Sequence, residues 1–369
     1  MSDFPLKINV SPDSVVDGFS DEVSIVVDGT PFSLWDDLEI VRNFDCIADT
    51  FTMSCPFDPD IKKTKEIFRP FKYKPCGIYI GGCRIIIGTI VNVETETTAD
   101  SKKLKIDGYT KTGVLNECSC PPAKWPISMK GLDLQEIAIR VASYYDLEVE
   151  FDDAPGAKFS GAEVVDIDAE REVYAVLTEL AQLRGFVVSS TVDGKLYFRK
   201  TPQGIATVTI KEGEMPYLSS KAVYNGQVRY SQVTMVKSNP RRGRGKSITA
   251  YDPELTRNNV NRCAVMKAED SEAGNLKNAS VTNIGRLIGM AVTVSLSLNG
   301  WRRYDNGDLW QDGDFLNFYS PGDMIYEETK FMVREAKLSK SANAVTTDLG
   351  LILPEAFSGE VRQRYPWES

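Results

Sequence analysis

The chain has 369 residues, of which 42% are hydrophobic and 26% charged, and its net charge is −9. This length allows two or three domains with proper cores, and the acidic balance argues against a general nucleic-acid binder. The sequence contains no histidine, which excludes a serine–histidine–aspartate triad and any zinc site with a histidine ligand.

Neither a membrane span nor a secretory signal is predicted. The longest apolar runs, such as Ile85–Ile87 and Leu351–Leu353, fall far short of the ~20 residues that cross a bilayer. The start, Met1-Ser2-Asp3-Phe4-Pro5, has no basic segment followed by an apolar one. The 7 cysteines are an odd number, so reduced thiols and assembly in the cytoplasm are expected.

The first predicted domain, residues 1–112, is an antiparallel β-barrel of six or seven strands. Its central stretch is Gly77–Glu94, where two β-rich runs meet at Gly81-Gly82, a pair suited to a tight hairpin turn. The other expected strands are Val23–Val27, Leu38–Phe44, Phe51–Cys55 and Leu104–Tyr109. Four prolines mark a long loop between residues 56 and 75. A small barrel would leave no unpaired edge.

The middle stretch, residues 113–205, is predicted to be an α/β linker domain. Apolar residues from Leu134 to Tyr145 recur with helical spacing, and Asp133 with Glu136 forms a capping-box pattern. A second helix is expected around Val173–Ala181, with Asp168 as its N-cap and Gly185 as its stop. A hairpin at Asp193-Gly194 follows.

A second β-barrel is predicted from residues 206–240 and 286–354, since its final strands echo the first domain. Residues 241–285 interrupt it as an insertion expected to pack with the linker domain, and residues 355–369 form a tail. The fold class is therefore mainly β with an α+β linker. It comprises two similar small antiparallel β-barrels joined by an α/β module, the second of them interrupted.

The order of barrel, linker, interrupted barrel and tail resembles the baseplate hub proteins of contractile phage tails, of the Mu type. That family is related to late control proteins and to the N-terminal half of type VI secretion spikes. The residues that carry the resemblance are Gly88–Val91, Ile106–Leu115, Leu180–Phe186, Asp193–Leu196 and Val333–Pro354.

The resemblance implies a structural protein of the virion tail rather than an enzyme. It implies a homotrimeric hub that adapts the sixfold tail tube protein to the threefold central spike protein, beside baseplate wedge proteins. DNA would pass through its channel without specific binding, and no cofactor or membrane insertion is expected. Whether a prophage encodes the chain is left open.

Two sets of residues are candidates for partner contacts. The basic cluster Arg241, Arg242, Arg244 and Lys246 suits an acidic partner or DNA, although glycine interleaving also fits a solvated loop. In the tail, Arg362, Arg364, Tyr365 and Trp367 suit docking on the spike, because aromatic and arginine residues anchor interfaces. The aromatic pair could equally fold back on its own barrel.

The alternative functions are a tail-associated peptidoglycan hydrolase, which would use paired carboxylates, and the base of a type VI-like secretion spike. The carboxylate clusters are Asp152-Asp153, Asp166 with Asp168, and Asp308 with Asp312 and Asp314. Aspartates at turns and caps are expected to bond the local backbone, so no catalytic residue is predicted. The run Asp305–Asp314 fails the EF-hand pattern and predicts a hairpin tip. Cys118-Ser119-Cys120, with Cys55, Cys76 and Cys83, predicts free buried thiols rather than a metal site.

Overall fold

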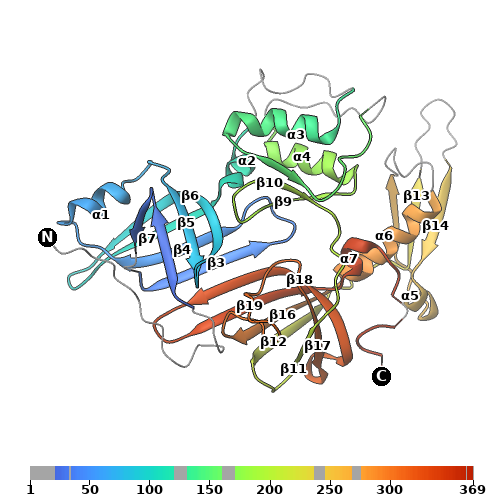
Figure 1. Cartoon of the computed structure of the whole chain (residues 1–369). Coiled ribbons are helices and arrows are strands. Elements are labelled where there is room, and N and C mark those ends of the chain that lie inside the picture. Colours follow the sequence, from blue (N-terminus) through green and yellow to red (C-terminus); the bar gives the residue numbers. More distant parts are fainter. Residues whose placement is uncertain are drawn as a thin grey trace.

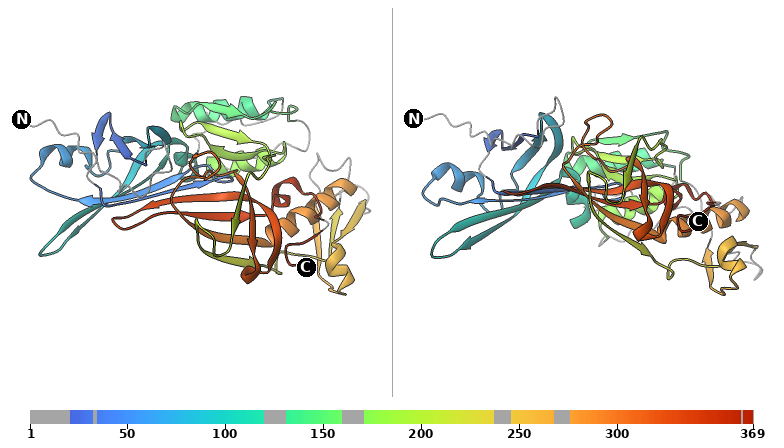
Figure 2. Two further views of the ribbon diagram at one scale, coloured as in Figure 1. Left: turned by 60° about the horizontal axis from the view of Figure 1, so that its bottom comes forward. Right: turned by 90° about the horizontal axis from the view of Figure 1, so that it is seen from below.

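The computed structural model describes residues 21–32, 35–119, 131–159, 171–236, 246–267, 276–362 and 364–368. Within them, one 13-stranded sheet runs through two β units, and two three-stranded sheets lie outside it. Figure 1 shows the first β unit in blue, the linker domain in green above, and the second β unit in olive and red. The insertion, in yellow and orange, lies at the opposite end from the first unit in both views of Figure 2.

The first β unit begins with two hairpins and ends with a meander. It contains β1 (Val23–Val27), β2 (Thr30–Phe32), β3 (Asp37–Asn43), β4 (Thr50–Pro56), β5 (Pro75–Ile80), β6 (Cys83–Thr97) and β7 (Lys102–Thr110). Gly81 and Gly82 both have positive φ, so the predicted turn between β5 and β6 is confirmed. The segment expected to be a loop contains helix α1 (Lys62–Ile67), which buries only Ile67 and therefore gives no periodic apolar signal.

The linker domain packs two helices on a three-stranded sheet. It contains α2 (Val114–Glu117), α3 (Leu134–Ala142), β8 (Val149–Phe151), α4 (Val173–Gln182), β9 (Val187–Ser190) and β10 (Leu196–Arg199), with 3-10 helices η2 (Lys111–Gly113) and η3 (Ser143–Tyr145). The capping box of α3 is confirmed, because Asp133 accepts from the Glu136 N–H and Glu136 accepts from the Asp133 N–H. The predicted cap of α4 is wrong: its N-cap is Glu172, and Asp168 lies outside the described residues.

The second β unit repeats the strand order of the first. It contains β11 (Val208–Lys211), β12 (Tyr217–Tyr224), β16 (Val292–Asn299), β17 (Phe315–Ser320), 3-10 helix η5 (Pro321–Asp323), β18 (Ile325–Lys340) and β19 (Val345–Ile352). The first unit has the order β1-β5-β6-β7-β4-β3, and the second has β11-β17-β18-β19-β16-β12. Five strands therefore correspond in sequence order and in antiparallel pairing, whereas β1 joins its neighbour antiparallel and β11 joins its neighbour parallel.

The insertion is a small unit between β12 and β16. Strands β13 (Gln232–Val236), β14 (Ser247–Tyr251) and β15 (Cys263–Lys267) form their own sheet, beside α5 (Pro253–Arg257) and α6 (Leu276–Met290). The sequence placed β13 in the second barrel, since a single apolar strand does not reveal its sheet. The insertion was expected to pack on the linker domain. Its described apolar core instead includes tail residues Val361, Tyr365 and Trp367, and α6 packs on α7 (Glu355–Ser358).

The two β units are joined edge to edge rather than closed as separate barrels. β18 pairs with β17 over its first half and with β3 over its second half, so a single strand belongs to both units. Closure of either unit into a barrel is not seen among the described strands. β18 extends past β17, and this further length provides the edge with which β3 pairs. No helix in the described ranges is long and apolar enough to span a bilayer.

Candidate assembly interface

The contact between the two β units, here called the central joint, is an antiparallel strand pair. Residues Glu335–Lys340 of β18 lie opposite Asn43–Leu38 of β3. Leu338 faces Ile40 across the joint, and both side chains are buried. On the other face, Lys337 Nζ lies 2.8 Å from Glu39 Oε2. Main-chain pairing and an apolar core thus fix the register of the two units.

The central joint continues into a shared apolar core. Leu338, Trp301 and Leu309 of the second unit belong to the same buried cluster as the core of the first unit. The Trp301 indole N–H donates to the carbonyl oxygens of Ser339 and Thr346, both at 3.1 Å. The ring of Trp301 is buried in the shared core and its N–H is hydrogen-bonded, so the two units pack as one body.

Four charged side chains meet beside the joint, from all three domains. Arg42 of the first unit lies 3.4 Å from Asp49 and 3.1 Å from Asp312 of the second unit. Arg199, at the end of β10 in the linker domain, also pairs with Asp312. Burial raises the pKa of Asp49 to about 7, although Arg42 favours the charged carboxylate and Asp312 opposes it. This buried charge cluster holds the three domains in one arrangement.

Two of the strand edges without a partner strand among the described residues, beside others such as β2 and β11, belong to β12 and to the second half of β6. β12 is the last strand of the sheet, and its outer edge exposes Leu218 (48%), Val223 (44%) and Tyr224 (38%). β6 pairs with β5 only up to Thr89, so its second half, Asn92–Thr97, has β7 alone beside it. Unpaired edges are sites where another chain can add a strand.

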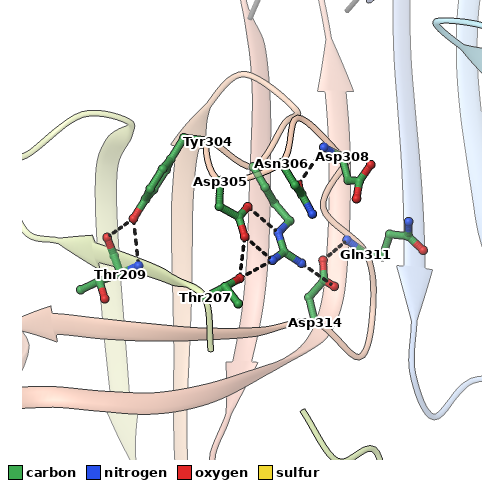
Figure 3. Close-up of polar contacts among 9 residues, drawn as sticks. Thr207, Thr209, Tyr304, Asp305, Asn306, Asp308, Gln311 and Asp314 are labelled. Atoms are coloured by element: carbon green, nitrogen blue, oxygen red, sulfur yellow. Dashed lines mark hydrogen bonds and ion pairs between the residues drawn. The ribbon is translucent and has the colours of Figure 1, made fainter. Parts of the chain in front are cut away.

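The run Asp305–Asp314 lies in the connection from β16 to β17, which do not pair with each other; the predicted hairpin is present only as a short turn closed by the bridge of Arg302 with Leu309. Figure 3 shows the carboxylates of Asp305 and Asp314 turned toward neighbouring groups of the same chain, whereas Asp308 is bonded through its backbone N–H to Asn306. Arg303 donates to Asp305 at 2.8 Å and to Asp314 at 3.0 Å, and the Gln311 N–H donates to Asp314 at 2.9 Å. The pKa of Asp305 is lowered, chiefly by its hydrogen bond from Arg303. These carboxylates fix the turn, as aspartates at turns are expected to do.

The remaining carboxylates are also held by local partners. Asp152 accepts from the Tyr197 hydroxyl and from the Lys200 N–H at 2.8 Å. Asp312 belongs to the buried charge cluster, and Asp166 and Asp168 lie outside the described residues. Asp152, Asp305, Asp312 and Asp314 are thus each engaged by a group of the same chain.

The C-terminal tail folds back on its own chain. Tyr365 is buried and stacks on Trp367 with ring centroids 4.9 Å apart, and the Arg229 guanidinium lies 4.7 Å above the Tyr365 ring. Trp367 donates to Glu254 at 3.0 Å, which ties the tail to the insertion. The tail arginines pair nearby, Arg362 with Glu355 and Arg364 with Glu327. The structure therefore shows the fold-back alternative, while docking on a spike stays a prediction.

The basic cluster and the cysteines provide no further contact site among the described residues. Lys246 is exposed just before β14, whereas Arg241, Arg242 and Arg244 lie outside the described residues. Burial raises the pKa of the Cys55 and Cys76 thiols to about 12, so both are protonated. Cys83 is exposed, against the expectation of a buried thiol, because it is the first residue of β6 and follows the Gly81-Gly82 turn directly. No group of three metal-ligating side chains occurs in the described part of the chain.

Two family models match consecutive parts of the chain. Residues 22–110 match the N-terminal domain of the Mu phage baseplate assembly protein GpP-like family, and residues 112–200 match the second domain of the baseplate hub protein gp44-like family. The boundary between the matches falls where β7 ends and the linker domain begins. The comparison thus follows the domain division of the structure.

Similar proteins agree in sequence and in fold. The baseplate hub protein gp44 of Escherichia phage Mu is 25% identical over 310 residues, which are 79% of this chain and 77% of that one. The 43 kDa tail protein of prophage MuSo2 from Shewanella oneidensis has a TM-score of 0.75 at 19% identity, covering 91% of this chain and 99% of that one. An Escherichia coli component of the type VI secretion system has a TM-score of 0.51 at 9% identity, covering 94% and 79%.

The fold, the edge-to-edge joint and these matches define a structural protein of phage tails, of the baseplate hub class. The chain carries a domain of the GpP-like family followed by a domain of the baseplate hub gp44-like family, and it is a homologue of the Mu hub protein gp44. The resemblance read from the sequence is confirmed. A baseplate hub protein is part of the virion tail, and neither matched family model describes an enzyme.

Proposed function

We propose that three copies of the chain form the hub ring that adapts the sixfold tail tube to the threefold central spike. The observation that carries this proposal is the repeated strand order of the two β units within one chain. Two equivalent units per chain give six around a ring of three chains, so one surface can meet a sixfold partner and another a threefold one. Ring formation would also cover the edges that neither unit closes by itself.

The ring would surround a channel through which DNA passes without specific binding. The net charge of −9 supports this, because an acidic wall repels phosphate and does not retain a passing duplex. The proposed partners are the tail tube protein, the central spike protein and baseplate wedge proteins, joined during assembly in the host cytoplasm.

Two contact roles belong to this proposal. The segment with Arg241, Arg242, Arg244 and Lys246 would contact an acidic partner subunit. In the tail, Arg364 is the residue best placed for the spike, since its side chain is 57% exposed even while paired with Glu327. Tyr365 and Trp367 would support that contact by holding the tail in place.

The test is the mass of the purified protein in solution. Light scattering at micromolar concentration is expected to give three times the chain mass of 41.0 kDa, and electron micrographs to show a ring with six lobes. A stable monomer of 41.0 kDa at that concentration contradicts the proposal. A ring of any other number of chains contradicts the match to sixfold and threefold partners.

A further inference from the structure

The central joint provides a template for a contact between two copies of the chain. It is formed by Glu335–Lys340 in the second half of β18 and by Leu38–Asn43 of β3. The Phe44 N–H extends the ladder by donating to the Arg334 carbonyl at 2.8 Å. In the strand order shared by the two units, β6 corresponds to β18 and β12 corresponds to β3. The equivalents of the two joined strands, β6 and β12, are therefore both strands with a free edge among the described residues.

The correspondence holds residue by residue. β18 has a bulge at Arg334 in its pairing with β19, and β6 has one at Val91 in its pairing with β7. Counting from these bulges, Asn92–Thr97 corresponds to Glu335–Lys340. Counting across β4 and β16 in the same way, Ser220–Asn225 corresponds to Leu38–Asn43.

We propose that Asn92–Thr97 of one copy pairs antiparallel with Ser220–Asn225 of a second copy, in the register of the central joint. This inference rests on the proposed ring and names the contact that closes it. The register places Asn92 opposite Asn225, Val93 opposite Tyr224, Glu94 opposite Val223, Thr95 opposite Ala222, and Glu96 opposite Lys221 of the second copy. Each chain offers the β6 edge to one neighbour and the β12 edge to another, so the contact is head-to-tail, the kind of contact from which a ring is built.

Charge supports this occupant. Lys221 of the second copy would lie on the same face as Glu94 and Glu96, both exposed in the single chain. The ion pair of the central joint, Lys337 with Glu39, has its equivalent in Glu94 with Lys221, with the two signs exchanged. Opposite charges across neighbouring strands stabilise the pairing of the strands.

Because the charges are exchanged between the central joint and the proposed contact, they also favour the correct strand partner in each. If β18 of one copy paired with β12 of another, Lys337 would face Lys221, and if β6 paired with β3, Glu94 would face Glu39. Both wrong pairings place like charges together, which disfavours them. Exposed Tyr224 on β12 gains apolar contact with Val93 in the pairing with β6.

A disulfide placed across the proposed contact tests it directly. Glu96 and Lys221 correspond to Ser339 and Glu39 of the central joint. Hydrogen-bonded and non-hydrogen-bonded pairs alternate along an antiparallel ladder. Counted from the hydrogen-bonded pair Phe44 and Arg334, the pair of Ser339 and Glu39 is a non-hydrogen-bonded one, in which the side chains are close. Such a position suits disulfide geometry. The variant Glu96→Cys/Lys221→Cys is expected to give covalent dimers and trimers on oxidation, whereas either single variant is not.

The control pair is Glu96→Cys with Val265→Cys, since Val265 on β15 is 70% exposed and lies outside the proposed contact. It should not cross-link. A trimer by light scattering without a cross-link in the Glu96–Lys221 pair overturns the edge pairing and leaves the proposed ring standing. A monomer without any cross-link overturns both.

A charge exchange gives a second, milder test. Lys221→Glu is expected to raise the concentration at half-assembly by about fivefold or more, because three contacts per ring lose their attraction. Adding Glu94→Lys and Glu96→Lys to the same chain should restore assembly, while the exposed Lys267→Glu on β15 should have no effect. Failure of the combined variant to recover while it stays folded contradicts the proposed pairing.

Discussion

The two β units share one strand order but differ in how their corresponding strands are used. β3 has β4 on one side and β18 on the other, and alternate residues of it are buried. β12, its equivalent, has β16 as its one strand partner in the described part of the chain and is exposed over most of its length. The short connection at residues 44–49 in the first unit corresponds to residues 225–291 in the second, which hold the whole insertion. The difference shows that a repeated scaffold can be specialised at its edges while its centre is unchanged.

The central joint, where β3 is paired on both sides, depends on the buried charge cluster beside it. Arg42→Ala leaves Asp49 and Asp312 without their shared cation and is expected to lower the free energy of unfolding by about 4 kcal/mol. Urea unfolding measures the loss. The control is Arg84→Ala, which breaks an exposed ion pair with Asp193 and should change stability little. Similar losses in both variants would show that the buried charge cluster does not hold the domains.

Leu338 on β18 and Thr95 on β6 are equivalent positions of the two units that differ in burial. Leu338 is buried in the joint, whereas Thr95, its equivalent on β6, is exposed. Leu338→Ala is expected to cost about 3 kcal/mol, because it leaves a cavity between the units. Thr95→Ala should change the unfolding free energy by less than about 0.5 kcal/mol. Equal effects at a fixed protein concentration would refute the assignment of Leu338 to a shared core.

Within the sheets, the units fill one cross-strand position differently. Gly108 lies opposite Phe51 in the first unit, and Leu351 lies opposite Val294 in the second. A Cβ at Gly108 would come within 2.3 Å of the Phe51 ring and of the Thr89 carbonyl oxygen. Gly108→Ala is therefore expected to cost about 2 kcal/mol.

The matched control is Gly226→Ala, where a Cβ meets no atom within 4 Å. Thermal melting of both variants measures the difference, with a change of less than about 0.5 kcal/mol expected for the control. A tolerated alanine at residue 108 would mean that the first unit packs as loosely there as open surface.

The smallest effect is a dependence on pH. Because the folded pKa of Asp49, about 7, lies above its unfolded value near 3.8, the folded state binds more protons between these values. Stability from this group is thus present below pH 4 and is lost as the pH rises to about 7, by at most about 1.4 kcal/mol per pH unit.

Asp49→Asn is expected to flatten that fall, measured as unfolding free energy against pH. The chain has no histidine to mask the change near pH 6, although burial raises the pKa of Asp314 as well and leaves a smaller slope. An unchanged profile in the variant would mean that Asp49 does not titrate in this range.

Local sequence patterns predicted the elements well where the structural reason is local. The hairpin glycines, the capping box of α3 and the alternation of Val292–Leu298 in β16 follow from backbone preference and periodic burial. Helix α1 and the separate sheet of β13 were missed. The first buries too little to leave a periodic signal, and the second depends on which strands lie beside it.

The candidate interface was predicted only as a class of protein. The meeting of Arg42, Asp49, Arg199 and Asp312 joins segments far apart in the chain, and no spacing rule connects them. The fold-back of Tyr365 and Trp367 was one of two alternatives; burial against Arg229 and the insertion shows it, while docking on the spike stays a prediction.

The sequence by itself determined that two β-rich segments of similar design flank an α/β linker, because strand and turn preferences act between near neighbours. Only the tertiary structure decided that β18 passes from one unit into the other and that the edges of β6 and β12 are left without a described neighbour. Strand pairing is made by backbone N–H and C=O groups, which hardly differ from one sequence to another. The choice of neighbour therefore depends on the length, register and charge of whole strands brought together by folding.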